Sequence, residues 1–211
     1  MEHYEACHRQ SSVMQMISAD VEDIRIVAQV ISGDVEAFST LVLRYQERVY
    51  QTIYSMVGDR DEADDLAQEV FVKALRSLHL FRGQSQFYTW LYRIAVNRCL
   101  DHLKARRLRV YVRENDGEVD AAVLNAKIPV GKETDQEASQ NEMQAILEMA
   151  LSNIPEEYRI AFVLREIDDL TYEEISEVLG CSVGTVKSRL FRARNRLQVL
   201  LRSFYQTWFE G

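Results

Sequence analysis

The segment spanning residues 169–200 constrains the fold more than any other part of this chain, because its sequence marks two short helices and a tight turn. Thr171 and Glu174 have the spacing of a capping box, in which the side chain of each residue binds the backbone N–H of the other. Gly180 suits the left-handed position that ends a helix, and Ser182 suits the N-cap of the next helix. Two helices joined in this way are typical of a helix-turn-helix.

The second helix of this motif is basic on its outward faces. Its predicted inward residues share helical spacing and are Val183, Val186, Leu190, Ala193 and Leu197. The other faces carry Lys187, Ser188, Arg189, Phe191, Arg192, Arg194 and Arg196. Such a helix fits the major groove of DNA, where arginine can donate two hydrogen bonds to guanine. The alternative is a solvated basic helix on an ordinary helical bundle.

Charge is segregated along the chain, although the net charge of −8 would by itself argue against nucleic-acid binding. Residues 182–202 carry six basic side chains and no acid, and residues 98–113 carry six basic side chains and one acid. Residues 59–69 carry six acids and one arginine, and residues 114–148 carry nine acids and two lysines. This distribution predicts two nucleic-acid contacts and a separate contact with a basic protein partner.

Helical periodicity and the scarcity of turn residues predict an all-α chain with two small helical domains. The 211 residues include only two prolines and eight glycines, and both types disfavour helix interiors. The predicted segments are an N-terminal extension (1–20), a first helical domain (21–111), a flexible acidic linker (112–138), a second domain with the helix-turn-helix (139–202) and a C-terminal tail (203–211).

Two helices of the first domain have specific expectations. In the helix predicted for residues 21–31, Ile24, Val27, Ala28 and Ile31 share one face. A later helix is predicted from about Ser85 through Lys104, after a loop that begins at Phe81.

That later helix begins in a segment rich in aromatic and basic side chains, a combination that suits single-stranded DNA. Phe87, Trp90, Leu91 and Ile94 have the spacing of core residues. Tyr88, Tyr92, Arg93 and Asn97 lie more to another face and are the better candidates for DNA contacts. Lys104, Arg106, Arg107 and Arg109 could hold duplex phosphates, or they could form only a solvated helix end.

Other classes of protein find little support in the sequence. No apolar run is long enough to cross a bilayer and the start lacks the pattern of a signal peptide, so we expect a cytoplasmic protein. The three cysteines are too few and too far apart for a disulfide framework, and the candidate metal sets at 3–8 and 99–102 lack four ligands. The letters DEAD at 61–64 lack the phosphate-binding loop that a helicase needs. We therefore expect no catalytic residue, cofactor, metal or small-molecule substrate.

Three segments together resemble the extracytoplasmic-function (ECF) sigma factors, most closely the sigma-E/AlgU branch of the sigma-70 family. They are DEADDLAQEVFVKAL (61–75), FRGQSQFYTWLYRIAVN (81–97) and LTYEEISEVLGCSVGTVKSRLFRAR (170–194). The resemblance extends from about Val21 to Leu201. It implies an alternative sigma factor that brings RNA polymerase core to the promoters of a stress or envelope regulon.

The resemblance also implies roles for individual residues. Asp65, Gln68 and Glu69 would bind the coiled coil of the polymerase β′ subunit. A flipped base of the melted −10 element would be read by Asn97 and the loop residues Phe81, Arg82, Gly83, Gln84, Ser85 and Gln86. The residue pattern described above adds Tyr88, Tyr92 and Arg93 as further −10 contacts, and Lys104, Arg106 and Arg107 on nearby duplex phosphates. The −35 element would be read by Lys187, Ser188, Arg189, Phe191 and Arg192.

Further partners follow from the same resemblance. The β flap of polymerase would be a second contact on core, and the acidic linker would run towards the active-site and RNA-exit channels. The usual inhibitor would be an anti-sigma factor bound to the inner membrane, so that the protein would be found there when inhibited and on the nucleoid when bound to polymerase.

Two rival interpretations remain open at the level of the sequence. An ordinary helix-turn-helix regulator would need a sensory or receiver domain with alternating strands and helices, whereas the first 110 residues look helical throughout. A sigma mimic would occupy polymerase or an anti-sigma factor without initiating, and the arginine-rich second helix argues against it.

Overall fold

The computed structural model describes residues 20–115 and 146–209, and it describes side chains for residues 20–109 and 146–202. Within these ranges every regular element is helical, which confirms the all-α prediction. The first group comprises a helix over 20–31, η1 (Val35–Ala37), α2 (Phe38–Val57), α3 (Arg60–Ser77), η2 (Leu78–Leu80) and α4 (Phe87–Asn115). The second group comprises a helix over 146–152, α6 (Glu156–Glu166), α7 (Tyr172–Leu179) and α8 (Val183–Phe209). No helix among the described residues is both long and apolar enough to span a membrane.

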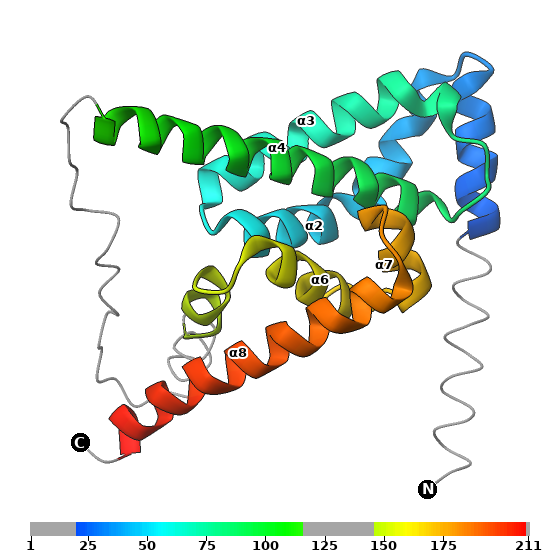
Figure 1. Ribbon diagram of the computed structural model, residues 1–211. Coiled ribbons are helices and arrows are strands. Elements are labelled where there is room, and N and C mark those ends of the chain that lie inside the picture. The colour runs from blue at the N-terminus through cyan, green and yellow to red at the C-terminus, as the bar shows by residue number, and fades with distance from the viewer. Residues whose placement is uncertain (1–19, 116–145, 210–211) are drawn as a thin grey trace, which may run out of the picture.

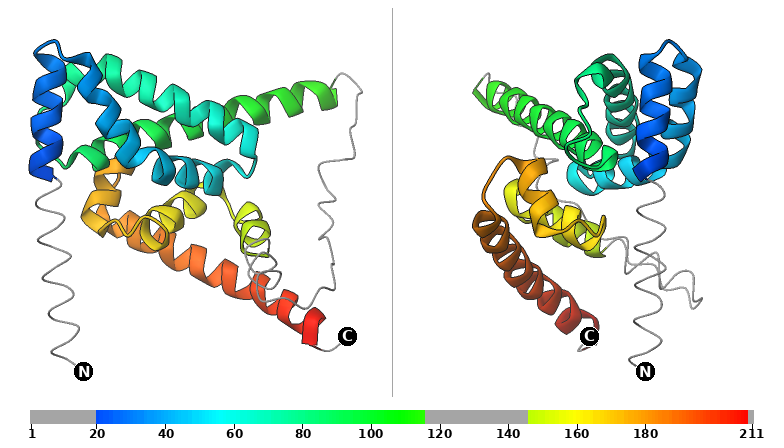
Figure 2. Two further views of the ribbon diagram at one scale, coloured as in Figure 1. Left: turned by 180° about the vertical axis from the view of Figure 1, so that it is seen from behind. Right: turned by 90° about the vertical axis from the view of Figure 1, so that its right-hand side faces the viewer.

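The two groups form two layers, with α2, α3 and α4 in one and α6, α7 and α8 in the other (Figures 1 and 2). Their helices touch directly, α4 against α7 and α2 against α6. One apolar core runs through both layers, because Ile53 of α2, Leu164 of α6 and Val186 of α8 belong to the same buried cluster. The two predicted domains are therefore packed against each other in this structure.

A glycine and a capping carboxylate separate α2 from α3. Gly58 ends α2 in the left-handed region at φ 78°, where glycine has no steric penalty. The side chain of Asp59 then accepts a hydrogen bond of 2.9 Å from the backbone N–H of Glu62 and caps α3. Asp61 and Glu62 in the first turn add favourable interactions with the helix dipole.

The helix over 20–31 buries only Val27 of the four residues predicted to face the core. Its buried residues are Asp23, Ile26, Val27 and Val30, whereas Ile24 and Ile31 are more than half exposed and Ala28 is exposed. The physical reason is the carboxylate of Asp23, which accepts hydrogen bonds from the side chains of Arg44 and Tyr45 on α2. A fully buried carboxylate needs such donors, so this polar cluster sets the rotation of the helix.

Two helices run further than the sequence patterns predicted. Helix α4 continues to Asn115, past the expected end at Lys104 and into the segment 112–138 predicted as a linker. Helix α8 continues to Phe209, through most of the predicted tail at 203–211. The segment 88–115 contains no glycine or proline and neither does 185–209, so nothing in the local sequence stops these helices. Residues 1–19, 116–145 and 210–211 lie outside the described ranges. Most of the predicted linker and of the predicted N-terminal extension falls within them.

Candidate nucleic-acid and polymerase interfaces

The helix-turn-helix forms with the predicted caps. The backbone N–H of Thr171 donates to Oε2 of Glu174 at 2.7 Å, and the backbone N–H of Glu174 donates to Oγ1 of Thr171 at 3.2 Å. Gly180 ends α7 in the left-handed region at φ 60°. Ser182 then accepts a hydrogen bond of 3.1 Å from the backbone N–H of Thr185 at the start of α8. These local bonds fix the turn between α7 and α8.

Apolar packing sets the face that α8 presents outward. The predicted inward residues Val186, Leu190, Ala193 and Leu197 are buried, and Val183 is half-buried. Val186 and Leu190 belong to the same buried cluster as Ile175 and Val178 of α7, whereas Ala193 and Leu197 pack with Ala150, Leu151 and Ile154. The basic faces of α8 are left on the surface, in the position of a recognition helix.

Four of the five predicted −35 residues are exposed along α8, and the fifth, Arg189, is half-buried. Lys187, Ser188, Phe191 and Arg192 are exposed, and Phe191 is 65% accessible. Arg189 is half-buried, and its Nη2 lies 3.4 Å from Oε2 of Glu157 on α6. Such a long, partly exposed ion pair is weak, so Arg189 can leave it to reach DNA.

Arg192 is oriented by a tyrosine of α6. Its Nη1 donates a hydrogen bond of 2.9 Å to the hydroxyl of Tyr158, and its guanidinium lies 5.7 Å from the ring centroid. A guanidinium held by stacking loses less conformational entropy when it binds a planar partner.

The loop that precedes α4 combines exposed polar residues with an anchored aromatic ring. Arg82, Gly83 and Gln84 are exposed, and Gly83 adopts φ 66°. Phe81 packs against Phe87 at 5.6 Å between ring centroids. The ring of Phe81 therefore anchors the loop in this structure.

The predicted core residues of α4 divide by exposure. Phe87 and Leu91 are buried, whereas Trp90 and Ile94 are half-buried. Gln86, just before the helix, has a buried Oε1 without a hydrogen-bond partner, and Ser85 is half-buried.

The candidate DNA contacts on α4 are not all on the free surface. Asn97 is exposed as predicted. Tyr92, however, is only 2% exposed, and Tyr88 is half-buried. Tyr88, Tyr92 and Arg93 all make hydrogen bonds to residues between Asp168 and Glu177 of the other layer. The exposed surface predicted for Tyr92 is thus covered here by the second domain.

The basic stretch of α4 is exposed but partly paired. Lys104 is exposed, Arg106 lies 3.3 Å from Glu62, and Arg107 lies 2.6 Å from Glu156 of α6. Exposed pairs of this kind contribute little stability and can be exchanged for phosphate contacts.

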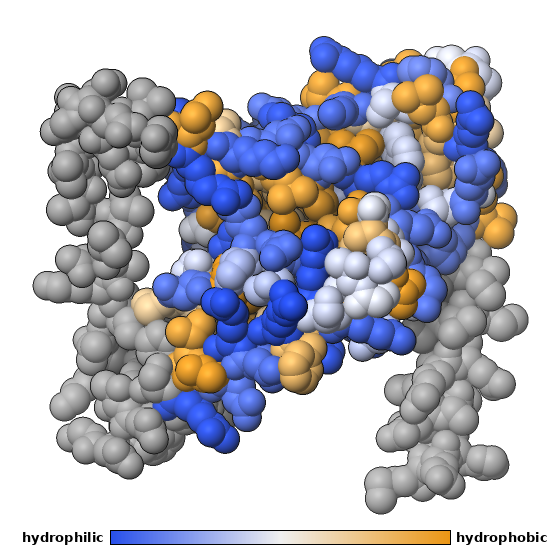
Figure 3. Space-filling model, viewed as in Figure 1, coloured by the Kyte–Doolittle hydropathy of each residue, from blue (hydrophilic) through white to orange (hydrophobic). Residues whose placement is uncertain are grey.

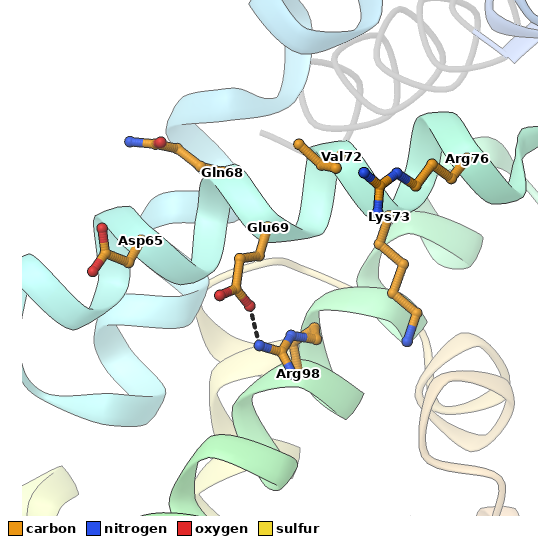
Figure 4. Close-up of a pocket in the computed structure, with 7 residues that line it drawn as sticks. All are labelled: Asp65, Gln68, Glu69, Val72, Lys73, Arg76 and Arg98. Carbon is orange, nitrogen blue, oxygen red and sulfur yellow. Dashed lines mark hydrogen bonds and ion pairs between the residues drawn. The ribbon is translucent and has the colours of Figure 1, made fainter.

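The acidic face of α3 surrounds a shallow depression of about 580 Å³ (Figure 4). Asp65, Gln68 and Glu69 line it and are exposed, and Val72 adds an apolar patch that is 49% accessible. Glu69 forms an ion pair with Arg98 of α4. Lys73 and Arg76 of α3 also line the depression, so its charge is mixed, and Asp65 and Glu69 are the two carboxylates there that suit a basic partner.

The chain matches two family models over separate segments. Residues 41–109 match sigma-70 region 2, and residues 144–197 match sigma-70 region 4. The chain is 42% identical over 191 residues to the RNA polymerase sigma-H factor of Pseudomonas aeruginosa. The match covers 86% of this chain and 96% of that protein. It is 39% identical over 191 residues to the ECF RNA polymerase sigma-E factor of Escherichia coli K12, with 88% of this chain and all of that protein covered. The chain belongs to the ECF sigma factors.

Two solved structures share its fold. The structure of CnrH in complex with the cytosolic domain of CnrY superimposes with a TM-score of 0.61 and 26% identity, over 84% of this chain and 96% of CnrH. The sigma factor RpoE in complex with the anti-sigma factor NepR from Bartonella quintana gives a TM-score of 0.61 and 28% identity, over 78% of this chain and 96% of RpoE. The resemblance to the sigma-E/AlgU branch is therefore confirmed, and the protein is an alternative sigma factor that directs promoter-specific transcription.

The residues that join the two domains of this sigma factor were not found by sequence reasoning. Asp168, between α6 and α7, is 4% exposed, and its carboxylate accepts hydrogen bonds from Thr52 and Tyr92. Burial raises the pKa of Asp168 to about 6, although these donors and the nearby Arg48 act in the opposite direction. The sequence pattern gives no signal for this site, because its partners lie 76 and 116 residues away along the chain.

Proposed function

We propose that this ECF sigma factor binds polymerase core through the acidic face of α3, captures the melted −10 element with the loop 81–86 and α4, and reads the −35 element with α8. One observation carries the proposal: a single chain combines a recognition helix with exposed basic side chains, an aromatic-basic segment and an acidic face, on three separate surfaces. We also propose the predicted domain division, 21–111 and 139–202, as the functional one. Sigma factors as a class are not enzymes, and we assign this chain no catalytic residue.

The acidic face of α3 is the proposed site for the β′ coiled coil. Asp65 and Gln68 project from α3 around the depression, where Glu69 is drawn towards Arg98 (Figure 4). An incoming basic side chain can replace Arg98 as the partner of Glu69, because an exposed ion pair is worth about 1 kcal/mol or less. Charge complementarity of this kind also speeds association.

The loop 81–86 and Asn97 are the proposed site for an extruded base of the −10 element. Opening the duplex costs unstacking energy, and capture of an extruded base in a polar pocket offsets that cost. Asn97 offers an amide, and the buried Oε1 of Gln86 has no partner in the described structure. Lys104, Arg106 and Arg107 follow on α4, where they would hold the phosphates of the adjoining duplex.

The exposed stretch of α8 is the proposed site for the −35 element. Lys187, Ser188, Phe191 and Arg192 face outward together, and Arg189 can join them on leaving Glu157. Arg192 and Arg189 suit guanine, and the ring of Phe191 suits a thymine methyl group.

Other partners are proposed from surfaces and relatives. An apolar groove of about 430 Å³ on the second domain, lined in part by Leu147, Phe162, Leu197 and Leu201, suits the β flap. The related RpoE is known in complex with an anti-sigma factor, and we propose that an anti-sigma factor, held at the inner membrane, inhibits this chain too. The proposed location is the cytoplasm and, on polymerase, the nucleoid. The proposed regulon is of the stress or envelope type.

Run-off transcription with purified bacterial core polymerase on fragmented genomic DNA tests the proposed function. We expect discrete transcripts that require this protein, and mapping their starts would define both promoter elements. Core binding without transcripts would instead support a sigma mimic. Duplex binding without any affinity for core would support an ordinary helix-turn-helix regulator.

A further inference from the structure

The first turn of α6 lies beside the part of α8 that is proposed to read the −35 element (Figure 1). The surface over α8 is largely hydrophilic, with scattered apolar side chains (Figure 3). Helix α6 begins directly after Pro155, and the backbone N–H of Tyr158 donates a hydrogen bond of 2.9 Å to the backbone oxygen of that proline. The carboxylate of Glu157 in this turn lies 3.4 Å from Arg189. The hydroxyl of Tyr158 accepts a hydrogen bond of 2.9 Å from Arg192.

The ring of Tyr158 is anchored by packing. The side chain is half-buried and packs against the apolar cluster that contains Ile154, Ala193 and Leu197. Ala193 and Leu197 belong to α8, so the position of the ring is tied to the helix that carries Arg192. A packed ring has few conformations open to it, and its hydroxyl therefore meets Arg192 from a defined point.

The hydroxyl of Tyr158 is neutral, unlike the carboxylate of Glu157. An arginine held by a carboxylate must leave its partner to bind DNA, as we infer for Arg189. Arg192 uses a donor at Nη1 for the hydroxyl, and the remaining N–H groups of its guanidinium stay available for guanine O6 and N7. The tyrosine can therefore stay in contact with Arg192 while Arg192 reads a base.

A long side chain that is already held loses less rotamer freedom when it binds its target. The guanidinium of Arg192 is directed by the hydroxyl and by the ring, whose centroid lies 5.7 Å from it. Arg196 lies 5.8 Å from the same centroid but stands one turn further along α8, outside the proposed −35 residues. Since base contacts specify sequence, loss of this orientation should lower discrimination between bases more than general affinity for DNA.

We propose that Tyr158 is a positioning residue of the −35 site, which aligns the guanidinium of Arg192 for a guanine and so sets the specificity at that base pair. This inference rests on the proposed reading of the −35 element by α8. Three features carry it: the hydrogen bond at Nη1, the packing of the ring against Ala193 and Leu197, and the neutral charge of the hydroxyl. Tyr158 acts through Arg192 rather than on DNA itself.

Variants of the full-length protein, assembled with core polymerase, test this role. Tyr158→Phe keeps the packed ring and removes the hydroxyl, whereas Tyr158→Leu removes both. Each would be made in the original protein and together with Arg192→Ala or Arg196→Ala. Competitive run-off transcription would compare the mapped promoter with templates that carry a single substituted base pair in the −35 element. Urea unfolding of each variant separates a loss of folding from a loss of positioning.

The base pair read by Arg192 is the one at which Arg192→Ala no longer discriminates. At that pair we expect Tyr158→Phe to lower discrimination about fivefold, which corresponds to one neutral hydrogen bond. Tyr158→Leu should lower it further, but by no more than Arg192→Ala does. Discrimination at the other base pairs should not change. Tyr158→Phe should have no effect beside Arg192→Ala and its full effect beside Arg196→Ala, because only the former lacks the side chain that the hydroxyl holds.

Unchanged discrimination in Tyr158→Phe would overturn the proposal, and so would an equal loss at every base pair. A loss that persists beside Arg192→Ala would also overturn it, because Tyr158 would then contact DNA or support the fold directly. Failure of the proposed function gives a different result, and the inference fails with it. In that case the original protein yields no transcripts, or Arg192→Ala leaves discrimination intact at every −35 base pair.

Discussion

Acidification should strengthen the packing between the two domains through Asp168. Burial raises the pKa of this carboxyl from its ordinary value of 3.8 to about 6, so the folded, closed protein holds the proton more tightly than the unfolded chain. The stabilisation from this proton is complete below about pH 3.8 and is lost as the pH rises through about 6. The charged groups facing the carboxyl are Arg48 on α2 and the neighbouring Asp169.

The size of the effect follows from the two pKa values. Each tenfold change in proton affinity corresponds to about 1.4 kcal/mol, so the full stabilisation is about 3 kcal/mol. Between about pH 7.5 and about pH 5 the proton is only partly gained, and the expected rise in the free energy of unfolding is about 1.4 kcal/mol.

Urea unfolding followed by circular dichroism at several pH values measures this rise. Asp168→Asn is the matched control, because its amide has the shape of the protonated carboxyl and does not titrate. Other acids with raised pKa values, such as Asp20 and Asp23, contribute equally to both proteins and cancel in the difference. If the two proteins show parallel stability curves between about pH 7.5 and about pH 5, the buried carboxyl does not control the packing and the reasoning is refuted.

Three further substitutions test the proposed surfaces. Arg192→Ala should weaken −35-dependent transcription about ten- to hundredfold and leave core affinity intact, whereas Arg196→Ala, one turn along α8, removes the same charge with a much smaller effect. Asp65→Arg should weaken core binding on the order of tenfold or more at moderate salt. Asp101→Arg, at an exposed position of α4, is the matched charge reversal. If the two variants bind core with equal affinity, the acidic face has no specific role in core binding. Asn97→Ala should lower permanganate reactivity of the −10 element in the open complex, and normal reactivity would contradict its assignment.

Local features of this protein could be predicted from its sequence because they depend on neighbours within a few residues. The capping box at Thr171 and Glu174, the left-handed Gly180 and the cap at Ser182 all satisfy backbone groups within one turn. The same holds for Gly58 and Asp59 between α2 and α3. Apolar spacing likewise predicted the buried face of α8, since no buried polar group competes with it over residues 183–202, where the side chains are described.

Interactions between distant segments could not be predicted in this way. The helix over 20–31 turned a different face inward because Asp23 finds its donors on α2, and apolar spacing carries no information about such a pair. Tyr92 was assigned to an exposed face, yet it is buried against Asp168. Both differences arise where a polar side chain meets a partner far away in the chain.

The sequence alone determined the helices, the caps, the helix-turn-helix and the family, because each of these depends on short spacings or on whole segments shared with relatives. Only the tertiary structure decided which surfaces are available. It packed α7 against α4, buried Asp168 between Thr52 and Tyr92, and covered part of the proposed −10 surface. The physical reason is that the burial of a charged or aromatic side chain depends on which segments meet in space, and no local pattern specifies that meeting.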